Sequence, residues 1–109
     1  MTKFAVGIDL GGTYTKLALV DTKGRVSHRA KLSTAAYGGR AGLIAAIVAE
    51  VRAVLEKSRL SPKNILGVGI GVPGVVDFKR GWVYNLTNVP GWKDTPPKRM
   101  LEAKLNVPV

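Results

Sequence analysis

The stretch Val6-Gly-Ile-Asp-Leu-Gly-Gly-Thr-Tyr-Thr-Lys16 decides how this chain of 109 residues is expected to fold. An apolar run ends in one acid, a pair of glycines follows, and a second apolar run begins at Leu17. Because glycine has no Cβ, Gly11 and Gly12 let the backbone turn sharply and approach a ligand closely. The stretch therefore predicts two strands joined by a tight glycine turn.

The polar residues of this stretch suit a phosphate group and a divalent cation. The carboxylate of Asp9 is a suitable ligand for Mg²⁺, directly or through water. Donors that suit phosphate oxygens follow at Thr13, Thr15 and Lys16. The spacing is not that of a Walker loop, in which a helix follows G-x-x-x-x-G-K-[ST]. An ordinary turn made by the acid and the glycines explains the same residues, so both interpretations stay open on spacing alone.

Length and composition predict one globular domain. The chain falls in the usual range of ~100–200 residues for a domain, and its 46% hydrophobic and 22% charged residues are ordinary. It has no cysteine, which excludes disulfides and thiolate metal sites. No signal peptide is apparent, and no apolar run approaches the ~18 residues of a membrane span. We therefore expect a cytoplasmic protein without a membrane partner.

The net charge of +10, from 17 Lys and Arg against 7 acids, is the one unusual property of the composition. Such a charge can indicate a polyanionic partner. The basic residues are scattered, however, and the longest runs are the pairs Lys79-Arg80 and Lys98-Arg99, whereas nucleic-acid-binding arms are denser. We therefore expect no nucleic-acid partner. The positive charge is expected to belong to a solvated surface, or to be balanced by an acidic remainder of a longer protein.

The hydrophobic pattern predicts an α/β domain. Strands are expected at 4–10, 15–21, 26–33 and 65–72, helices at about 40–58 and 96–105, and a small hairpin around 78–80. The strand at 65–72 is apolar on both faces, as in a sheet covered on both sides. Asp94 and Thr95 are expected to cap the second helix, and residues 106–109 to begin another strand. One apolar stripe should pack the first helix onto the core: Leu43, Ile44, Ile47, Val48, Val51, Val54 and Leu55.

A second glycine-rich stretch, Gly69-Ile-Gly-Val-Pro-Gly74, formally matches the G-x-G-x-x-G of dinucleotide-binding proteins. That motif needs a helix after the last glycine, and Pro73 with the following Val-Val-Asp gives none. Two other interpretations remain: glycines that let a buried strand pack closely against its neighbours, and a turn at the floor of a small-molecule site.

The two glycine stretches together resemble the ROK family (repressor, open reading frame, kinase). Ile8 to Thr13 is similar to the D-x-G-x-T phosphate motif of the sugar kinase, Hsp70 and actin superfamily. Val68 to Asp77, followed by Gly81 to Trp92, resembles ROK sugar kinases, with the bacterial glucokinases fitting best. The resemblance covers about residues 4–109. It implies a ribonuclease H-like (actin-like ATPase) fold with a mixed sheet, cut within its fifth strand, as the N-terminal domain (residues 1–109) of a two-domain kinase.

The resemblance implies ATP and Mg²⁺ as cofactors and a hexose, glucose above all, as the partner. The family likeness places Asp9 at the metal and at the phosphates of ATP. The other implied contacts are Gly11, Gly12, Thr13 and Lys16 with ATP, and Gly74, Thr87 and Asn88 with the sugar. Trp82 and Trp92 are interpreted as packing residues and His28 as a surface residue. The parent is expected to be a homodimer that transfers the γ-phosphate to the sugar 6-hydroxyl.

One departure from the family pattern is important. The family's general base is an Asp in an E-N-D-A-N-like segment after a V-P-V strand start, and this sequence ends at Val107-Pro-Val109. We therefore expect the 109 residues alone to be inactive. Alternatives are a fructokinase, an N-acetylmannosamine or N-acetylglucosamine kinase, and a ROK repressor. In a repressor we would expect a helix-turn-helix ahead of the phosphate motif, and Met1 lies only eight residues before Asp9. A ribonuclease H-like nuclease would need several carboxylates, and residues 65–74 contain none.

Overall fold

Four strands form the main sheet, in the order β3–β2–β1–β4. The computed structural model describes residues 3–77, 79–86, 89, 91–92 and 95–109. Strands β1 (Phe4–Leu10), β2 (Tyr14–Asp21) and β3 (Val26–Ser33) are antiparallel neighbours, and β4 (Ile65–Gly71) runs parallel to β1. The strands expected from the sequence are thus confirmed, with ends that differ by no more than one residue.

Alternation along β1 sets which face of the sheet is buried. Val6, Ile8 and Leu10 are buried, whereas Gly7 and Asp9 between them are exposed. Successive side chains of a strand point to opposite faces, so the apolar residues define the core face and the glycine and acid define the other. The turn between β2 and β3 is held by Asp21, whose carboxylate accepts from backbone N–H groups, chiefly that of Arg25, which lowers the pKa of Asp21.

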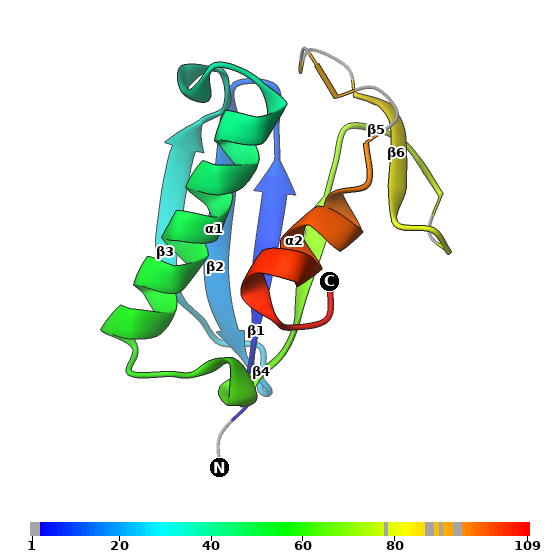
Figure 1. Cartoon of the computed structure of the whole chain (residues 1–109). Helices are drawn as coiled ribbons and strands as arrows, with labels where there is room; N and C mark the ends of the chain where they lie inside the picture. The colour runs from blue at the N-terminus through cyan, green and yellow to red at the C-terminus, as the bar shows by residue number, and fades with distance from the viewer. Residues whose placement is uncertain (1–2, 78, 87–88, 90, 93–94) are drawn as a thin grey trace.

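Two helices cover the core face. Figure 1 shows α1 (Arg40–Lys57) and α2 (Pro97–Leu105) on the same side of the sheet. All seven residues of the expected stripe in α1 are buried. No side-chain cap starts this helix, so its stability comes from burial, at about 1.5–3 kcal/mol for each large apolar side chain. The core also includes Leu17, Leu19, Ile65, Val68, Val83, Val89, Trp92, Leu101, Leu105 and Val107.

The helix ends agree with the expected ones to within one residue, whereas the predicted cap of the second helix does not form. Helix α1 ends at Lys57, one residue before the expected end, and Arg59 just beyond it takes a left-handed conformation at φ +56°. The N-cap of α2 is Pro96 and makes no side-chain cap bond, so the predicted cap is wrong at Thr95, while Asp94 lies outside the described residues. No helix in the described part of the chain has the length and apolar character needed to cross a membrane.

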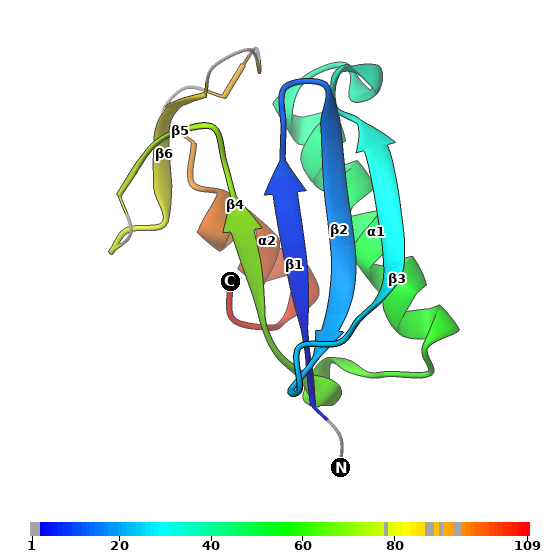
Figure 2. The same ribbon diagram turned by 180° about the vertical axis from the view of Figure 1, so that it is seen from behind.

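The opposite face of the sheet carries no helix in the described residues, as Figure 2 shows. The prediction that residues 65–72 are buried on both faces is therefore wrong for this chain. Leu66 is 57% exposed, and Gly69 and Gly71 are exposed too, because both helices lie on the other side. In the described part of the chain, this apolar strand therefore has one face against the helices and one face that they leave uncovered.

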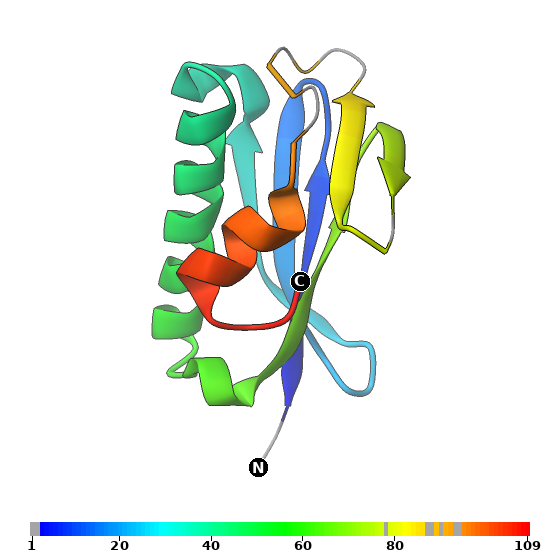
Figure 3. The ribbon, with the colours of Figure 1, turned by 45° about the vertical axis from the view of Figure 1, so that its right-hand side comes forward.

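A separate two-stranded sheet, β5 (Gly74–Asp77) and β6 (Trp82–Leu86), lies beside the upper end of β4 in Figure 3. It confirms the predicted hairpin around residues 78–80. The carboxylate of Asp77 accepts from the backbone N–H groups of Lys79 and Arg80 and holds the turn. Residues 107–109 form no strand, although the N–H of Val68 in β4 donates to the carbonyl oxygen of Pro108 at 2.8 Å.

Candidate functional site

The turn between β1 and β2 needs glycine for a steric reason. The N–H of Gly11 donates to the carbonyl oxygen of Tyr14 at 3.0 Å, and a Cβ on Gly11 would lie only 2.6 Å from that same oxygen. The turn is therefore as tight as the sequence predicts. Gly12 is half-buried and Thr13 is exposed at its tip.

Thr34 supports this turn from the far end of β3. Its hydroxyl donates to the carbonyl oxygen of Gly11 at 2.7 Å, and its N–H donates to the carbonyl oxygen of Thr13 at 3.0 Å. The hydroxyls of Thr15 and Thr34 lie 2.9 Å apart in the buried region behind the turn. Because the single proton of Thr34 is directed at Gly11, Thr15 must donate to Thr34. These bonds fix the turn before any ligand arrives.

The prediction of Thr15 as a phosphate donor is therefore wrong. Thr15 has no exposed surface, and its hydroxyl is used inside the protein. The alternation with the buried Leu17 and Leu19 on the same strand already indicated this direction. No local pattern pointed to Thr34, because its partners lie 19 and 23 residues away.

Replacing Thr34 by alanine is expected to lower the free energy of unfolding by about 1–3 kcal/mol, because the buried Thr15 hydroxyl and the Gly11 carbonyl lose their partner. Thr34→Ser keeps the hydroxyl and should stay within about 0.5 kcal/mol of the parent sequence. Urea unfolding measures both. Equal losses in the two variants would show that the methyl group of Thr34, rather than its hydroxyl, stabilises the turn.

Asp9 and Lys16 lie next to each other on the helix-free face. They are directly paired between β1 and β2, and Asp9 is also the register partner of Gly71 on β4. Both side chains are exposed, and both line a hollow of about 610 Å³ on this face. Their arrangement offers one carboxylate and one ammonium group beside the braced glycine turn.

The acidic residues of the described chain are compatible with a Mg²⁺ site that uses one carboxylate, but not with a two-metal site. No group of three or more His, Cys, Asp or Glu side chains gathers anywhere in the described residues. Asp9 alone cannot make the carboxylate cluster that a two-metal nuclease needs. A Mg²⁺ ion bound through one carboxylate, water and substrate phosphates is compatible with it, since Mg²⁺ keeps several waters and takes few protein ligands.

The expected sugar contacts follow the end of β4. Gly74 begins β5, is exposed, and lines a second hollow of about 420 Å³ that shares Gly69 with the first. It follows Gly71 by three residues, so the parallel pairing of β1 and β4 brings the two glycine stretches to one edge of the sheet. Gly74 and Asp9 do not line the same hollow. Thr87 and Asn88 lie outside the described residues.

The dinucleotide interpretation of residues 69–74 is wrong, because strand β5 and not a helix follows Gly74. Close packing applies to a different glycine of β4. A Cβ on Gly67 would lie 3.3 Å from the carbonyl oxygen of Pro108, whereas one on Gly69 would meet no atom within 4 Å. The exposed Gly69 instead leaves the surface between the two hollows flat.

The segment after β6 is anchored at several points. Trp92 is 1% exposed and Val89 is buried, so both pack in the core. Thr95 exchanges two backbone hydrogen bonds with Val83, and its hydroxyl accepts from Arg40 at the start of α1, 3.0 Å away. Contacts with a strand, a helix and the core thus hold both ends of the segment on which the expected sugar contacts lie.

The sequence and fold match known proteins over nearly the whole chain. A family model described as the ROK family matches residues 5–109. The chain belongs to the ROK family. It is 31% identical to a glucokinase of Halalkalibacterium halodurans over 98% of this chain and 32% of that protein. It is also 31% identical to a putative xylose repressor of a Caldicellulosiruptor species, over 95% of this chain and 26% of the repressor.

A solved ROK structure confirms the fold. The crystal structure of a ROK family glucokinase from Streptomyces griseus, in complex with glucose and AMPPNP, aligns with a TM-score of 0.81 and 32% identity. The alignment covers 97% of this chain and 31% of that one. The ROK chain described here thus spans between a quarter and a third of the length of these relatives. Its mixed sheet with helices is the actin-like ATPase fold expected from the resemblance.

Proposed function

We propose that this ROK chain is the N-terminal domain of an ATP-dependent hexose kinase, with glucose as the acceptor. One observation carries the proposal: Asp9, Lys16 and the braced turn at Gly11 lie at the same edge of the sheet as Gly71, three residues before Gly74. Phosphoryl transfer needs positioning and charge neutralisation more than covalent chemistry by the protein. A fixed turn with one acid and one ammonium group beside it supplies both.

Each residue has a role in this proposal. Gly11, Gly12 and Thr13 contact the ATP phosphates. Lys16 neutralises the charge of these phosphates, because a lysine ammonium group binds phosphate as a point charge. Asp9 holds the hydration shell of Mg²⁺, which supplies further neutralisation when it is bound. Gly74, Thr87 and Asn88 orient the sugar so that its 6-hydroxyl faces the γ-phosphate. We place the general base beyond Val109, since Asp9 is assigned to the metal and the carboxylate of Asp77, which lines the second hollow, already accepts from the N–H groups of Lys79 and Arg80.

A ROK repressor is the second candidate, and the similarity to a putative xylose repressor favours it. Such a protein would keep the fold and bind sugar without transferring phosphate. The two candidates differ in one measurable property, which is the formation of sugar phosphate from ATP. The other hexose kinases of the family differ from a glucokinase only in the sugar that they accept.

The test uses the full-length parent of this chain with ATP, Mg²⁺ and a panel of hexoses. We expect ATP-dependent formation of glucose 6-phosphate by the parent and none by the 109 residues alone, because the base is absent from them. Sugar binding without turnover in the parent would favour the repressor. Turnover by the 109 residues would overturn the assignment of the base. We also propose that the parent is a cytoplasmic homodimer. Light scattering on the purified parent measures the number of subunits.

A further inference from the structure

Arg40, the first residue of α1, contacts the segment between β6 and α2. Its guanidinium donates to the hydroxyl of Thr95 at 3.0 Å; Arg40 is half-buried, and Thr95 has no exposed surface. Gly91 of the same segment also lies close to α1. A Cβ on Gly91 would be 4.0 Å from the backbone nitrogen of Arg40, and the φ of +84° at Gly91 favours glycine. The start of α1 therefore meets this segment at two points.

The start of α1 is also connected to the glycine turn between β1 and β2, through the short helix η1 (Thr34–Tyr37). Thr34, the first residue of η1, donates to the carbonyl oxygens of Gly11 and Thr13. Figures 1 and 3 show the glycine turn, η1 and the start of α1 at one end of the molecule. Residues 38 and 39 alone separate η1 from Arg40.

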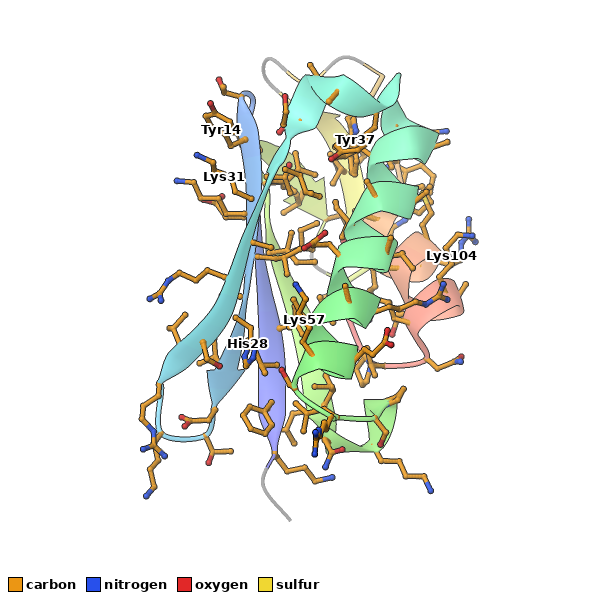
Figure 4. The ribbon with its side chains drawn as sticks, turned by 90° about the vertical axis from the view of Figure 1, so that its left-hand side faces the viewer. Tyr14, His28, Lys31, Tyr37, Lys57 and Lys104 are labelled. Atoms are coloured by element: carbon orange, nitrogen blue, oxygen red, sulfur yellow. The ribbon has the colours of Figure 1, made fainter. Side chains whose placement is uncertain are left out.

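Helix η1 and the first turn of α1 pack closely against each other. A Cβ on Gly42, near the start of α1, would overlap the carbonyl oxygen of Tyr37, so glycine is needed there for a steric reason. Figure 4 shows Tyr37 beside this end of α1. The contacts that run from the glycine turn through Thr34, η1 and Arg40 to Thr95 are thus continuous.

We propose that Arg40 is a positioning residue for the sugar: through Thr95 it holds the segment between β6 and α2 at a fixed place relative to the glycine turn. This inference rests on the proposed function, which assigns sugar contacts to that segment and phosphate contacts to the turn. Transfer between two bound substrates depends on their distance and orientation, and a displacement of about 1 Å can slow it by about 10²-fold. Arg40 itself contacts neither substrate.

Arg52 offers a matched control on the same helix. Its guanidinium also bonds to another element, because it donates to the backbone carbonyl oxygen of Lys104 on α2 at 2.8 Å. Figure 4 shows Lys104 and Tyr37 at different heights along α1, so this bond lies away from the glycine turn. Both arginines therefore join α1 to a later part of the chain. Of the two, only Arg40 joins it to the segment with the expected sugar contacts.

The first experiment measures binding of glucose, and separately of AMPPNP with Mg²⁺, to the full-length parent by titration calorimetry. The variants are Arg40→Met and Arg52→Met, which keep a long side chain and remove the guanidinium. Without its bond the segment occupies the binding position only part of the time, and the apparent affinity falls by that fraction. We expect Arg40→Met to bind glucose about tenfold more weakly, the scale of one lost hydrogen bond from a charged group, and to bind AMPPNP within about twofold of the parent. Arg52→Met should change neither.

The second experiment tests the partner of Arg40. Thr95→Val keeps the shape of the buried side chain and removes its hydroxyl, whereas Thr95→Ser keeps the hydroxyl. We expect Thr95→Val to lose at least as much glucose affinity as Arg40→Met, and Thr95→Ser to stay close to the parent. The double variant of Arg40→Met and Thr95→Val should bind glucose no more weakly than Thr95→Val alone, because residues that act through one bond have non-additive effects. Urea unfolding of each variant measures stability separately, which is all that a merely structural role would change.

Three results would overturn the proposal: unchanged glucose affinity in Arg40→Met, an equal loss in Arg52→Met, or additive losses in the double variant. Formation of glucose 6-phosphate is measured separately from binding. A parent that binds glucose with the expected dependence on Arg40, but does not phosphorylate it, would support the positioning role and refute the kinase. A parent that phosphorylates glucose, and binds it equally well after Arg40→Met, would support the kinase and refute the positioning role. A parent that binds no glucose would refute both.

Discussion

Asp9→Asn in the full-length parent is expected to lower ATP-dependent glucose phosphorylation by a factor on the order of 10³, because one element of charge neutralisation at the transferred phosphate is lost. The substitution removes the charge and keeps the size of the side chain. Asp9 is exposed and no hydrogen bond ties it to the described residues, so the fold should be unaffected. A coupled assay of glucose 6-phosphate formation gives the rate, and circular dichroism checks the fold.

The matched control for this prediction is Glu56→Gln, which removes one exposed carboxylate from α1, on the opposite side of the sheet. Its rate should equal that of the parent. If Asp9→Asn kept a rate within about twofold of the parent, the metal role of Asp9 would be refuted. A rise in the KM for glucose with unchanged kcat would place Asp9 in sugar binding instead.

Trp92→Ala is expected to lower the free energy of unfolding by about 3–5 kcal/mol, the usual cost of emptying a large aromatic site in a core. Trp92 is 1% exposed and is one of the largest fully buried side chains of the described chain. A loss of this size is a large part of the stability of a typical domain. Urea unfolding measures it through the midpoint at a constant slope.

Trp82→Ala is the comparison that separates packing from sugar stacking. Trp82 is only half-buried, and the guanidinium of Arg80 lies 4.5 Å from the centre of its ring. Its loss should cost about 1 kcal/mol, the scale of a partly exposed cation–π contact. A Trp92→Ala variant as stable as the parent, but with weaker glucose binding, would overturn the packing role of Trp92.

Much of the fold could be predicted because its signals are local. The buried stripe of α1 recurs at helical spacing, and the strands alternate or run apolar between glycines, so their positions follow from short windows of sequence. The same holds for the glycine turn at Gly11, whose steric need for glycine involves a residue only three positions away. The covering of the strand at 65–72 could not be predicted, because it depends on which side of the sheet each helix packs.

The residues of the candidate site were proposed from the sequence, but the contacts that support its turn could not be. The ligand roles of Asp9 and Lys16 stay predictions, whereas the buried direction of Thr15 was readable from strand alternation. Thr34, by contrast, reaches the turn from the far end of β3 and had no local signal. The same reason hides the role of Arg40, whose partner Thr95 lies 55 residues along the chain.

By itself, the sequence determined the strands, the helices, the family and the tight glycine turn of this protein, because each depends on residues close together along the chain. The tertiary structure alone decided three things: that Thr34 braces the turn, that both helices cover one face, and that Lys16, Lys31 and Arg29 line one hollow on the other. The physical reason is the register in which the strands pair. Pairing between strands brings together residues whose separation in sequence says nothing about their separation in space.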